Sequence, residues 1–406
     1  MDKNIIKFYW YRLTKFSLFH IAILVLFYQE RGLSFSQIMI LQSLYYFAKV
    51  LSEVPTGAWA DRVGRKKSLI FGSFFHSSAY LLIFLSHSFI LFILGEIIAG
   101  ISMSFAYGAD SALAYDTLKS LGRKDEYQRV EGNGNSMRFL GFALFAPVGG
   151  LLATKSLALP YLASSIVIFL SGLVALTFVE PPRENESVMD SELKVRRKSY
   201  YEMQKSLDLM LGQKRILWFV LFFSLIFLAT RLGFWTYQPY MRKVGLPVSL
   251  FGVVFAFFHL FSALVSKYAD RMERALKEKL MLFVMPALVV ISFVLLSRFL
   301  FLWSISFILI QQVTTAMHEP VLKNYLNRYT SSDVRATMLS FQNMAGNVAF
   351  ALFAPFLGSL VDRFHIENAL LIFALVIIIF SSLLWRYRQR WFKATKIWLE
   401  PSREET

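Results

Sequence analysis

Two carboxylates interrupt an apolar stretch of the sequence at residues 89–117. Glu96 and Asp110 are separated by 14 residues, which places them about 40° apart around a helix and so on one face. A charged side chain inside a membrane costs on the order of several kcal/mol unless it is paired or hydrated, so each is a functional candidate by default. Such carboxylates can carry a proton or hold a cation. For Glu96, a permanent ion pair with Lys49 or Arg138 is the competing interpretation.

Later apolar stretches carry further polar groups at helical spacing. With Asp110, the neighbours His318 and Glu319 favour a gate or a proton relay, and hydrogen bonding at helix ends is the alternative. Arg231 is a further ionisable candidate for proton coupling in a central cavity. Residues that share faces with these groups are predicted to line that cavity: His20, Tyr107, Trp235, Gln238, Gln311, Gln312 and Thr315. A lone histidine such as His20 also fits a packed position.

The elements that must position these residues are membrane-spanning helices. The chain is 56% hydrophobic, which is more apolar surface than a soluble protein of 406 residues can bury. Stretches of the length needed to cross a bilayer lie at 13–30, 34–58, 67–86, 89–117, 127–153, 157–179, 216–240, 248–269, 279–297, 299–326, 335–361 and 366–386. The predicted fold class is therefore all-α integral membrane, with twelve spans.

The predicted organisation is two halves and two polar segments. An N-terminal six-helix bundle covers 1–180 and a C-terminal one covers 216–388. Residues 181–215 form a polar linker with a predicted amphipathic helix, and 389–406 form a basic tail. The 41 Phe suit a pocket for lipophilic compounds, although lipid-facing aromatic residues explain most of them.

The net charge of +16 follows from membrane topology. With both termini in the cytoplasm, 34 of the 43 Lys and Arg fall on the cytoplasmic side, 6 on the far side and 3 within spans. This bias agrees with the positive-inside rule and needs no nucleic-acid partner. The chain has no Cys, which excludes disulfides and thiolate metal sites, and no metal site is predicted. We expect a multi-pass protein of a bacterial cytoplasmic membrane, in contact with the lipid bilayer.

The loop after the second apolar stretch carries a recognisable motif. "GAWADRVGRKKSL", residues 57–69, resembles the signature of the major facilitator superfamily. The matching residues are Gly57, Asp61, Arg62, Gly64, Arg65 and Lys66. Arg65 requires a carboxylate partner, and Asp116 is the predicted one. The resemblance implies two parallel-repeat bundles, a monomer, a small-molecule substrate and a latch that closes the cytoplasmic side. For Arg62 and Lys66, simple anchoring at the membrane surface is the alternative.

Internal repeats support a duplicated half. The triplet Ala60-Asp61-Arg62 recurs as Ala269-Asp270-Arg271, giving a degraded second copy of the motif at Asp270, Arg271 and Arg274. "FALFAP" occurs twice at nearly the same separation and carries Pro147 and Pro355. A proline inside a helix removes one hydrogen bond and permits a bend. These two segments are predicted to be equivalent parts of two gate helices.

Two departures from the family pattern bear on function. "GFALFAPVGG" resembles the antiporter motif of the fifth span but has Ala146 for a glycine and one residue fewer after Pro147. Glu96 stands where the family's fourth span has Arg. The chain is similar to bacterial drug/proton antiporters, which favours proton-coupled export of amphipathic small molecules with the proton as coupling ion and no cofactor. Uptake of a small polar solute by symport and lipid translocation are the alternatives.

An enzyme is not predicted. The six His are scattered rather than convergent, and no phosphate-binding loop of the Walker type occurs. A scaffold without transport has no need for Asp110, Arg231 and Glu319 in its interior. The sequence therefore predicts a secondary transporter that works by alternating access.

Overall fold

The computed structural model describes residues 1–182, 212, 214–329 and 332–393, and these residues form helices joined by short loops. The N-terminal half, residues 1–182, consists of α-helices with short 3₁₀ turns at 19–22 and 124–126. The helices are α1 (Asn4–Lys15), α2 (Leu24–Glu30), α3 (Phe35–Val63), α4 (Arg65–Leu85), α5 (Phe89–Ala106), α6 (Ala109–Ser120), α7 (Tyr127–Ala153) and α8 (Leu159–Leu176), of which α1 and α2 are two arms of one bent segment.

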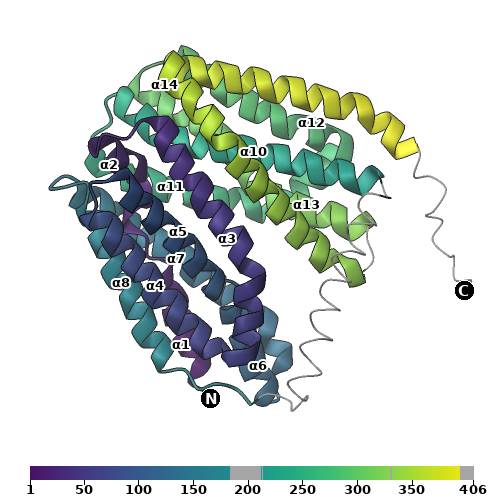
Figure 1. Cartoon of the computed structure of the whole chain (residues 1–406). Helices are drawn as coiled ribbons and strands as arrows, with labels where there is room; N and C mark the ends of the chain where they lie inside the picture. The colour runs from purple at the N-terminus through teal and green to yellow at the C-terminus, as the bar shows by residue number, and fades with distance from the viewer. Residues whose placement is uncertain (183–211, 213, 330–331, 394–406) are drawn as a thin grey trace, which may run out of the picture.

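The C-terminal half, residues 214–393, repeats this arrangement (Figure 1). It contains α10 (Lys214–Lys243), α11 (Val248–Lys267), α12 (Ala269–Arg298), a 3₁₀ helix at Leu302–Phe307, α13 (Ile308–Tyr329) and α14 (Ser332–Lys393). Backbone breaks divide α12 at Lys277 and α14 at His365. The predicted linker helix lies outside the described residues, as do residues 394–406 of the predicted tail.

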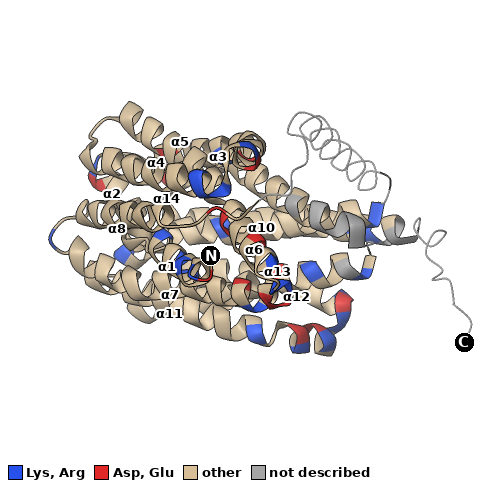
Figure 2. Ribbon diagram, turned by 90° about the horizontal axis from the view of Figure 1, so that it is seen from below, with Lys and Arg blue, Asp and Glu red and all other residues tan. Residues whose placement is uncertain are grey.

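Eight helices of the described chain are long and apolar enough to cross a membrane, or nine when the bent pair at residues 4–30 counts as one span. The predicted count of twelve stays a prediction. α3 and α13 are not among the eight, and both carry polar side chains along their length; α14 counts once although it bends at His365. In Figure 2 the charged residues gather toward the helix ends, with long uncharged stretches between them.

The first helical segment starts earlier than expected. The sequence predicts a span at 13–30, but α1 begins at Asn4. Arg12 and Lys15, which we assign from the sequence to the cytoplasmic flank, are therefore buried within the N-terminal half. A hydropathy profile does not predict that this segment is buried, because the partners that compensate the charges of Arg12 and Lys15 lie far away in the sequence.

The two halves repeat at two different offsets in the sequence. Gly32 and Gly245 both have positive φ, a conformation that suits glycine. In each case the next residue closes the same turn, Leu33 N to Tyr28 O and Leu246 N to Met241 O, both at 3.0 Å. The helix breaks at Gly64 and Lys277 repeat at the same offset as these turns. We call it the longer offset, because the proline hexapeptides repeat at a slightly shorter one.

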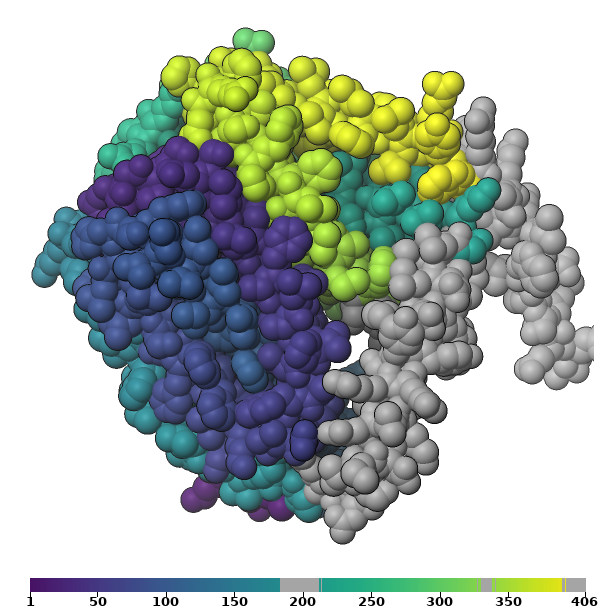
Figure 3. Space-filling view, viewed as in Figure 1, coloured from purple at the N-terminus to yellow at the C-terminus, as the bar shows by residue number. Residues whose placement is uncertain are grey.

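The hexapeptides form two equivalent seams between the halves, α7 against α11 and α14 against α3. Phe142 stacks on His259 with ring centroids 5.7 Å apart, and Phe350 meets Tyr46 at 5.2 Å. Phe142 and Phe350 are related by the shorter offset, and Tyr46 and His259 by the longer one, so the repeat relates the two contacts. Figure 3 shows the second seam, where the purple and blue surface of the N-terminal half meets the yellow-green of α14.

Glycines allow the backbones to approach closely at one end of each seam. A Cβ at Gly150 would lie 2.8 Å from Ser249 O, and one at Gly358 would lie 2.8 Å from Ser36 Cα. Small residues permit such close packing between membrane helices. We call this end, with the turns at Gly32 and Gly245, the closed end.

Four hydrogen bonds also join the halves at the closed end. Gln238 on α10 accepts from Val25 N at 2.7 Å and donates to Ile21 O at 2.9 Å. The Asp362 carboxylate accepts from Phe35 N and Ser36 N at 2.9 and 2.8 Å, which caps the start of α3. The opposite end, with α6 and the break at Gly64, is called the open end; Figure 1 shows α6 and α13 diverging there.

Candidate functional site

A buried charge network occupies the N-terminal half near its open end. Arg12 on α1 pairs with Asp110 on α6, Nε to Oδ2 at 2.8 Å, and with Glu131 on α7, Nη2 to Oε1 at 2.8 Å. Arg12 also donates to Ser111 Oγ at 2.8 Å, and Asp110 accepts from Ser111 N. The guanidinium therefore ties three helices together. Within the described residues Asp110 bonds to this network and makes no hydrogen bond or ion pair with His318 or Glu319, so the predicted gate or relay stays a prediction.

Glu96 is buried among neutral hydrogen-bond donors. Its side chain accepts from Tyr28 Oη at 2.6 Å and from Gln42 Nε2 at 3.1 Å, and the residue is 4% exposed. Neither Lys49 nor Arg138 pairs with it, so the ion-pair interpretation is wrong within the described structure. Its partners belong to the N-terminal half, which places Glu96 inside that bundle and away from the predicted central cavity. A carboxyl group held by neutral donors is suited to gaining and losing a proton.

Further ionisable side chains lie between these two carboxylates. Lys15 donates its Nζ to Gly72 O at 2.8 Å. Neither ring nitrogen of His76 has a hydrogen-bond partner in the described structure, and its ring lies 4.5 Å from that of Tyr80. His20 bonds Ser164 Oγ at 2.9 Å and stacks on Tyr161. His20 is thus packed within the N-terminal half rather than lining a cavity.

Cations and an exposed carboxylate occupy the space between the halves. Arg231 on α10 lies over the ring of Tyr46 on α3, 5.4 Å from its centroid. Lys49 on α3 lies 5.2 Å from the ring centroid of Tyr107, which is 54% exposed. Glu319 pairs with Lys323 at 2.6 Å and its side chain is 70% exposed.

Electrostatic interactions connect these groups across the two halves. Glu319 acts on Tyr107 and on Arg138, both in the N-terminal half, and Lys49 interacts with Arg231 and Arg138. Glu319 is largely exposed and acts on side chains of the other half, so it lies on the face of the C-terminal half that is turned toward the N-terminal half. Tyr107 and Thr315, which is also exposed, fit the prediction of a central lining.

The remaining predicted lining residues of the C-terminal half are buried inside it. Gln311 donates to Thr230 O at 3.1 Å, and Gln312 accepts from Ser262 Oγ at 2.9 Å. His318 bonds Phe223 O at 2.9 Å rather than Glu319. Trp235 is buried with its indole nitrogen unpartnered in the described structure, and Gln238 joins the halves at the closed end. One polar face along a helix predicts polar packing, and it does not say whether that packing is within or between bundles.

The motif at residues 57–69 forms the predicted ion pair. Arg65 Nη1 lies 2.6 Å from Asp116 Oδ2. Glu180 accepts from Arg65 N and Lys66 N at 2.8 Å each, and so caps the start of α4. Gly64 has φ of 126°, and a Cβ there would lie 3.2 Å from the Glu180 carboxylate. Glycine is thus required at this helix break. The latch function of this arrangement stays a prediction.

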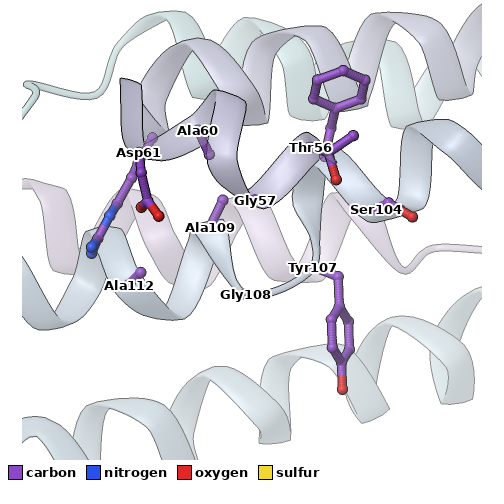
Figure 4. A pocket seen from close by; sticks show the side chains of 11 residues that line it. Thr56, Gly57, Ala60, Asp61, Ser104, Tyr107, Gly108, Ala109 and Ala112 are labelled. Carbon is purple, nitrogen blue, oxygen red and sulfur yellow. The ribbon is translucent and has the colours of Figure 1, made fainter. Parts of the chain in front are cut away.

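A pocket lies beside the motif, between the end of α3 and the break between α5 and α6. Figure 4 shows Asp61 and Ala112 at one end and Thr56 at the other, with Gly57 and Ala109 between them. Ala109 is the first residue of α6, so Asp61 lies near the start of a neighbouring helix. Arg62 is exposed at the end of α3.

The second motif copy lies one helical turn from its structural counterpart. The breaks at Gly64 and Lys277 align the halves at the longer offset, whereas the repeated triplet matches at an offset that is one turn shorter. At the longer offset, Tyr329 Oη donates to Glu278 Oε2 at 2.6 Å where the first half has Asp116 and Arg65.

The residues of the predicted second copy lie on α12 before its break. Asp270 accepts from Asn324 Nδ2 at 2.9 Å. Arg271 lies 5.7 Å from the ring centroid of Tyr268, and Arg274 is exposed. Glu278 also pairs with Arg388 at 2.9 Å. The open end of the C-terminal half thus has a carboxylate held by a tyrosine and an arginine where the N-terminal half has the pair of Arg65 with Asp116.

Several important residues were missed from the sequence. Arg12 precedes the predicted span at 13–30, and Lys15 and Glu131 lie near the start of the predicted spans at 13–30 and 127–153. All three therefore read as charges near the membrane surface. Tyr28 and Gln42 are unremarkable in an aromatic-rich chain until Glu96 is seen between them. Helical spacing from Arg12 to Lys15 was the available signal, because it puts both on one face.

Comparison with known proteins identifies the family. The sequence profile of the Major Facilitator Superfamily matches residues 12–349. The chain belongs to this superfamily. Its members' transporter architecture agrees with the two repeated halves, and the protein is a multi-pass membrane protein. The relatives it matches are transporters rather than enzymes.

Three superfamily relatives illustrate the likeness. The MFS-type transporter YxaM of Bacillus subtilis, described as uncharacterized, is 22% identical over 87% of this chain and 88% of its own. The class H tetracycline resistance protein of Pasteurella multocida is 22% identical over 78% of each chain. The nucleoside transporter NupG has the same fold, with a TM-score of 0.78, 12% identity and coverage of 97% of this chain and 100% of that one.

Proposed function

We propose that the protein is a secondary active transporter that exports amphipathic small molecules by alternating access, in exchange for protons. The observation that carries this proposal is the pair of equivalent seams. Both seams tighten at the closed end through Gly150 and Gly358, while Glu319 and Tyr107, which interact electrostatically across the two halves, are exposed. Two related contacts of this kind let the halves rock about a central site.

Glu96 is the proposed protonation site. It is buried, it accepts hydrogen bonds from Tyr28 and Gln42, and no cation fixes its charge. The Arg12 network holds Asp110 as a salt-bridged carboxylate, which suits a structural role better than proton exchange. We therefore place proton coupling at Glu96, within the N-terminal bundle. The coupling reaches the substrate through movement of α2 and α3, which carry its two donors and which border the central space.

Export is favoured over uptake by one relative and one motif. The relative named for tetracycline resistance covers most of this chain, and the hexapeptide around Pro147 resembles an antiporter motif. The proposed setting is a bacterial cytoplasmic membrane, with twelve spans and both termini in the cytoplasm, so that the open end faces inward. The protein acts as a monomer in the lipid bilayer, with a small-molecule substrate and no cofactor beyond the proton.

Everted membrane vesicles test this proposal. Respiration sets up a pH gradient, a quenched dye reports it, and amphipathic anions, cations and neutral compounds are added in turn. We expect one class to dissipate the gradient with the unmodified protein. Glu96→Gln abolishes the effect. Glutamine keeps an acceptor oxygen for Tyr28 and Gln42, but its side chain cannot gain or lose a proton. Glu126→Gln, at an exposed loop, is the control.

The outcomes separate the candidate functions. If no compound dissipates the gradient while the protein is inserted and folded, export by antiport is wrong. Uptake in whole cells, driven by an inward proton gradient, then identifies a symporter. An unchanged signal in Glu96→Gln places the proton elsewhere.

A further inference from the structure

The charges between the two halves indicate the class of substrate. Arg138, Arg231 and Lys49 lie near the middle of α7, α10 and α3, the depth at which transporters of this architecture bind substrates. Lys49 lies within electrostatic range of both guanidinium groups and is repelled by each, so we treat the three cations together. We call them the central cation cluster.

Two members of the cluster have no carboxylate partner in the described structure. Arg138 rests against aromatic rings, 5.4 Å from the centroid of Phe16 and 5.2 Å from that of Phe139. Arg231 likewise lies over Tyr46 and Phe227. The Nε atoms of both arginines are buried without a hydrogen-bond partner. A permanent charge at this depth normally has a partner, and a bound anion supplies one.

The carboxylates nearby do not balance the cluster. Glu319 is already paired with Lys323 at 2.6 Å, and Asp110 with Arg12 at 2.8 Å. Glu53, one turn after Lys49, attracts the Lys49 ammonium, but it is exposed and forms no ion pair with it in the described structure. The space between the halves therefore carries a net positive charge. A lipophilic cation, the ligand that an acidic pocket selects, is disfavoured here.

Aromatic side chains provide the apolar surface beside the cluster. Tyr107 is 54% exposed, and its ring centroid lies 5.2 Å from the Lys49 ammonium. The partly buried ring of Phe227 has its centroid 5.4 Å from the Arg231 guanidinium. A planar apolar body fits against such rings, and a carboxylate fits the two arginines.

We propose that the central site binds an amphipathic organic anion, with a carboxylate held by Arg138 and Arg231 and an aromatic body against Tyr107 and Phe227. This inference rests on the proposed transport function and names its substrate class. Exchange of such a substrate for a proton agrees with the separate positions of the cationic residues at the interface and of the buried carboxylate in the N-terminal bundle. The anion occupies the interface, and the proton occupies Glu96 inside the N-terminal bundle.

Binding to the purified protein tests the site independently of transport. Three probes share one ring system and differ in charge: naphthalene-1-acetate, naphthalene-1-acetamide and 1-naphthylmethylammonium, each titrated by isothermal calorimetry. We expect the acetate to bind at least about tenfold more tightly than the amide, as one charge-assisted contact implies, and the ammonium not to bind. Equal binding of all three probes, or preference for the ammonium, overturns the proposal even if transport is established.

Variants locate the binding to the cluster. Arg138→Gln and Arg231→Gln each weaken acetate binding about tenfold or more and leave amide binding unchanged. Arg231→Lys keeps the charge and retains part of the affinity. Arg298→Gln, on the exposed end of α12, is the matched control. If a glutamine variant fails to fold, the three probes on the unmodified protein still decide between anion and cation.

Lipid and inorganic anions are separate arms of the same experiment. Protein in nanodiscs with phosphatidylglycerol is compared with protein in phosphatidylcholine, and inorganic phosphate is added as a competitor. We expect neither to displace the acetate fully, because neither carries an aromatic body. Complete displacement by phosphatidylglycerol identifies a lipid headgroup site and contradicts the proposal. Complete displacement by phosphate identifies a general anion site and contradicts it equally.

Discussion

The two halves share their packing but not their charges. Equivalent contacts recur in both seams, Phe142 on His259 and Phe350 on Tyr46. In contrast, the buried ionisable residues of the described helices concentrate in the N-terminal half: Arg12, Lys15, His20, His76, Glu96 and Asp110. In the C-terminal half the membrane-depth cation Arg231 faces the other half instead. The repeat thus preserved the packing between the halves while the buried charges diverged. In the proposed mechanism, this divergence places the proton in one half and the substrate at the interface.

The largest expected effect comes from breaking the buried network of the N-terminal half. Asp110→Asn leaves Arg12 with Glu131 alone, and loss of one partner of a buried ion pair costs about 3–5 kcal/mol. We expect a marked fall in the midpoint of thermal unfolding, read by size-exclusion chromatography of heated samples. Glu126→Gln removes surface ion pairs with Arg123 and Arg129 and should leave the midpoint unchanged. Equal effects of the two variants contradict the structural role given to Arg12.

Adding one methyl group to each seam tests whether the seams are equivalent. Gly150→Ala and Gly358→Ala each place a Cβ about 2.8 Å from the backbone of the other half, and overpacking costs about 1–3 kcal/mol. We expect similar losses of thermal stability from both. Gly132→Ala, also in α7 but with open space around its Cβ, should not destabilise. If only one of the two variants loses thermal stability, the two seams do not contribute equally to the closed end.

A smaller effect distinguishes the two seams. Asp362 caps α3 across the halves, and its counterpart at the shorter offset is Thr154, whose hydroxyl bonds locally to Leu151 O. Loss of a cap costs about 1 kcal/mol. We expect Asp362→Ala to lower the unfolding midpoint and Thr154→Ala to leave it in place. If Thr154→Ala has the larger effect, the α3 cap is not what holds the closed end.

The smallest effect concerns the loops at the open end. A double-mutant cycle of Arg65→Gln and Asp116→Asn measures the predicted latch pair, and one of Glu278→Gln and Tyr329→Phe measures its counterpart. Both pairs are partly exposed, so we expect coupling energies of about 0.5 kcal/mol in unfolding. Transport should respond more to the first pair. Equal transport losses at both loops argue against a one-sided latch.

Much of the fold was accessible from the sequence because the length of an apolar segment and the polar turns that bound it depend only on neighbouring residues. The fifth span was predicted at 127–153, the bounds of α7, because Tyr127 follows a charged turn and Ala153 precedes a polar one. The ion pair of Arg65 with Asp116 followed from a motif whose partner sits at a defined helix end. The equivalence of the hexapeptides followed from their identity.

What the sequence did not reveal depends on contacts between distant segments. The orientation of Glu96 depends on Tyr28 and Gln42, 68 and 54 residues away. The burial of Arg12 depends on carboxylates 98 and 119 residues away. The recurrence of Ala-Asp-Arg obscured the longer offset at which the helix breaks repeat. Residues one helical turn apart lie on nearly the same face, so the shorter offset fitted the helical pattern almost as well.

Alternating access is the central claim, and distances across both ends of the molecule test it most directly. The chain contains no cysteine, so spin labels can be placed at Ser120→Cys with Lys323→Cys for the open end and at Lys155→Cys with Arg242→Cys for the closed end. Pulsed electron paramagnetic resonance is recorded at several pH values, with and without naphthalene-1-acetate. The account predicts reciprocal changes, with the open-end distance shortening in the conditions that lengthen the closed-end distance. Distances that stay fixed at both ends in every condition would contradict it.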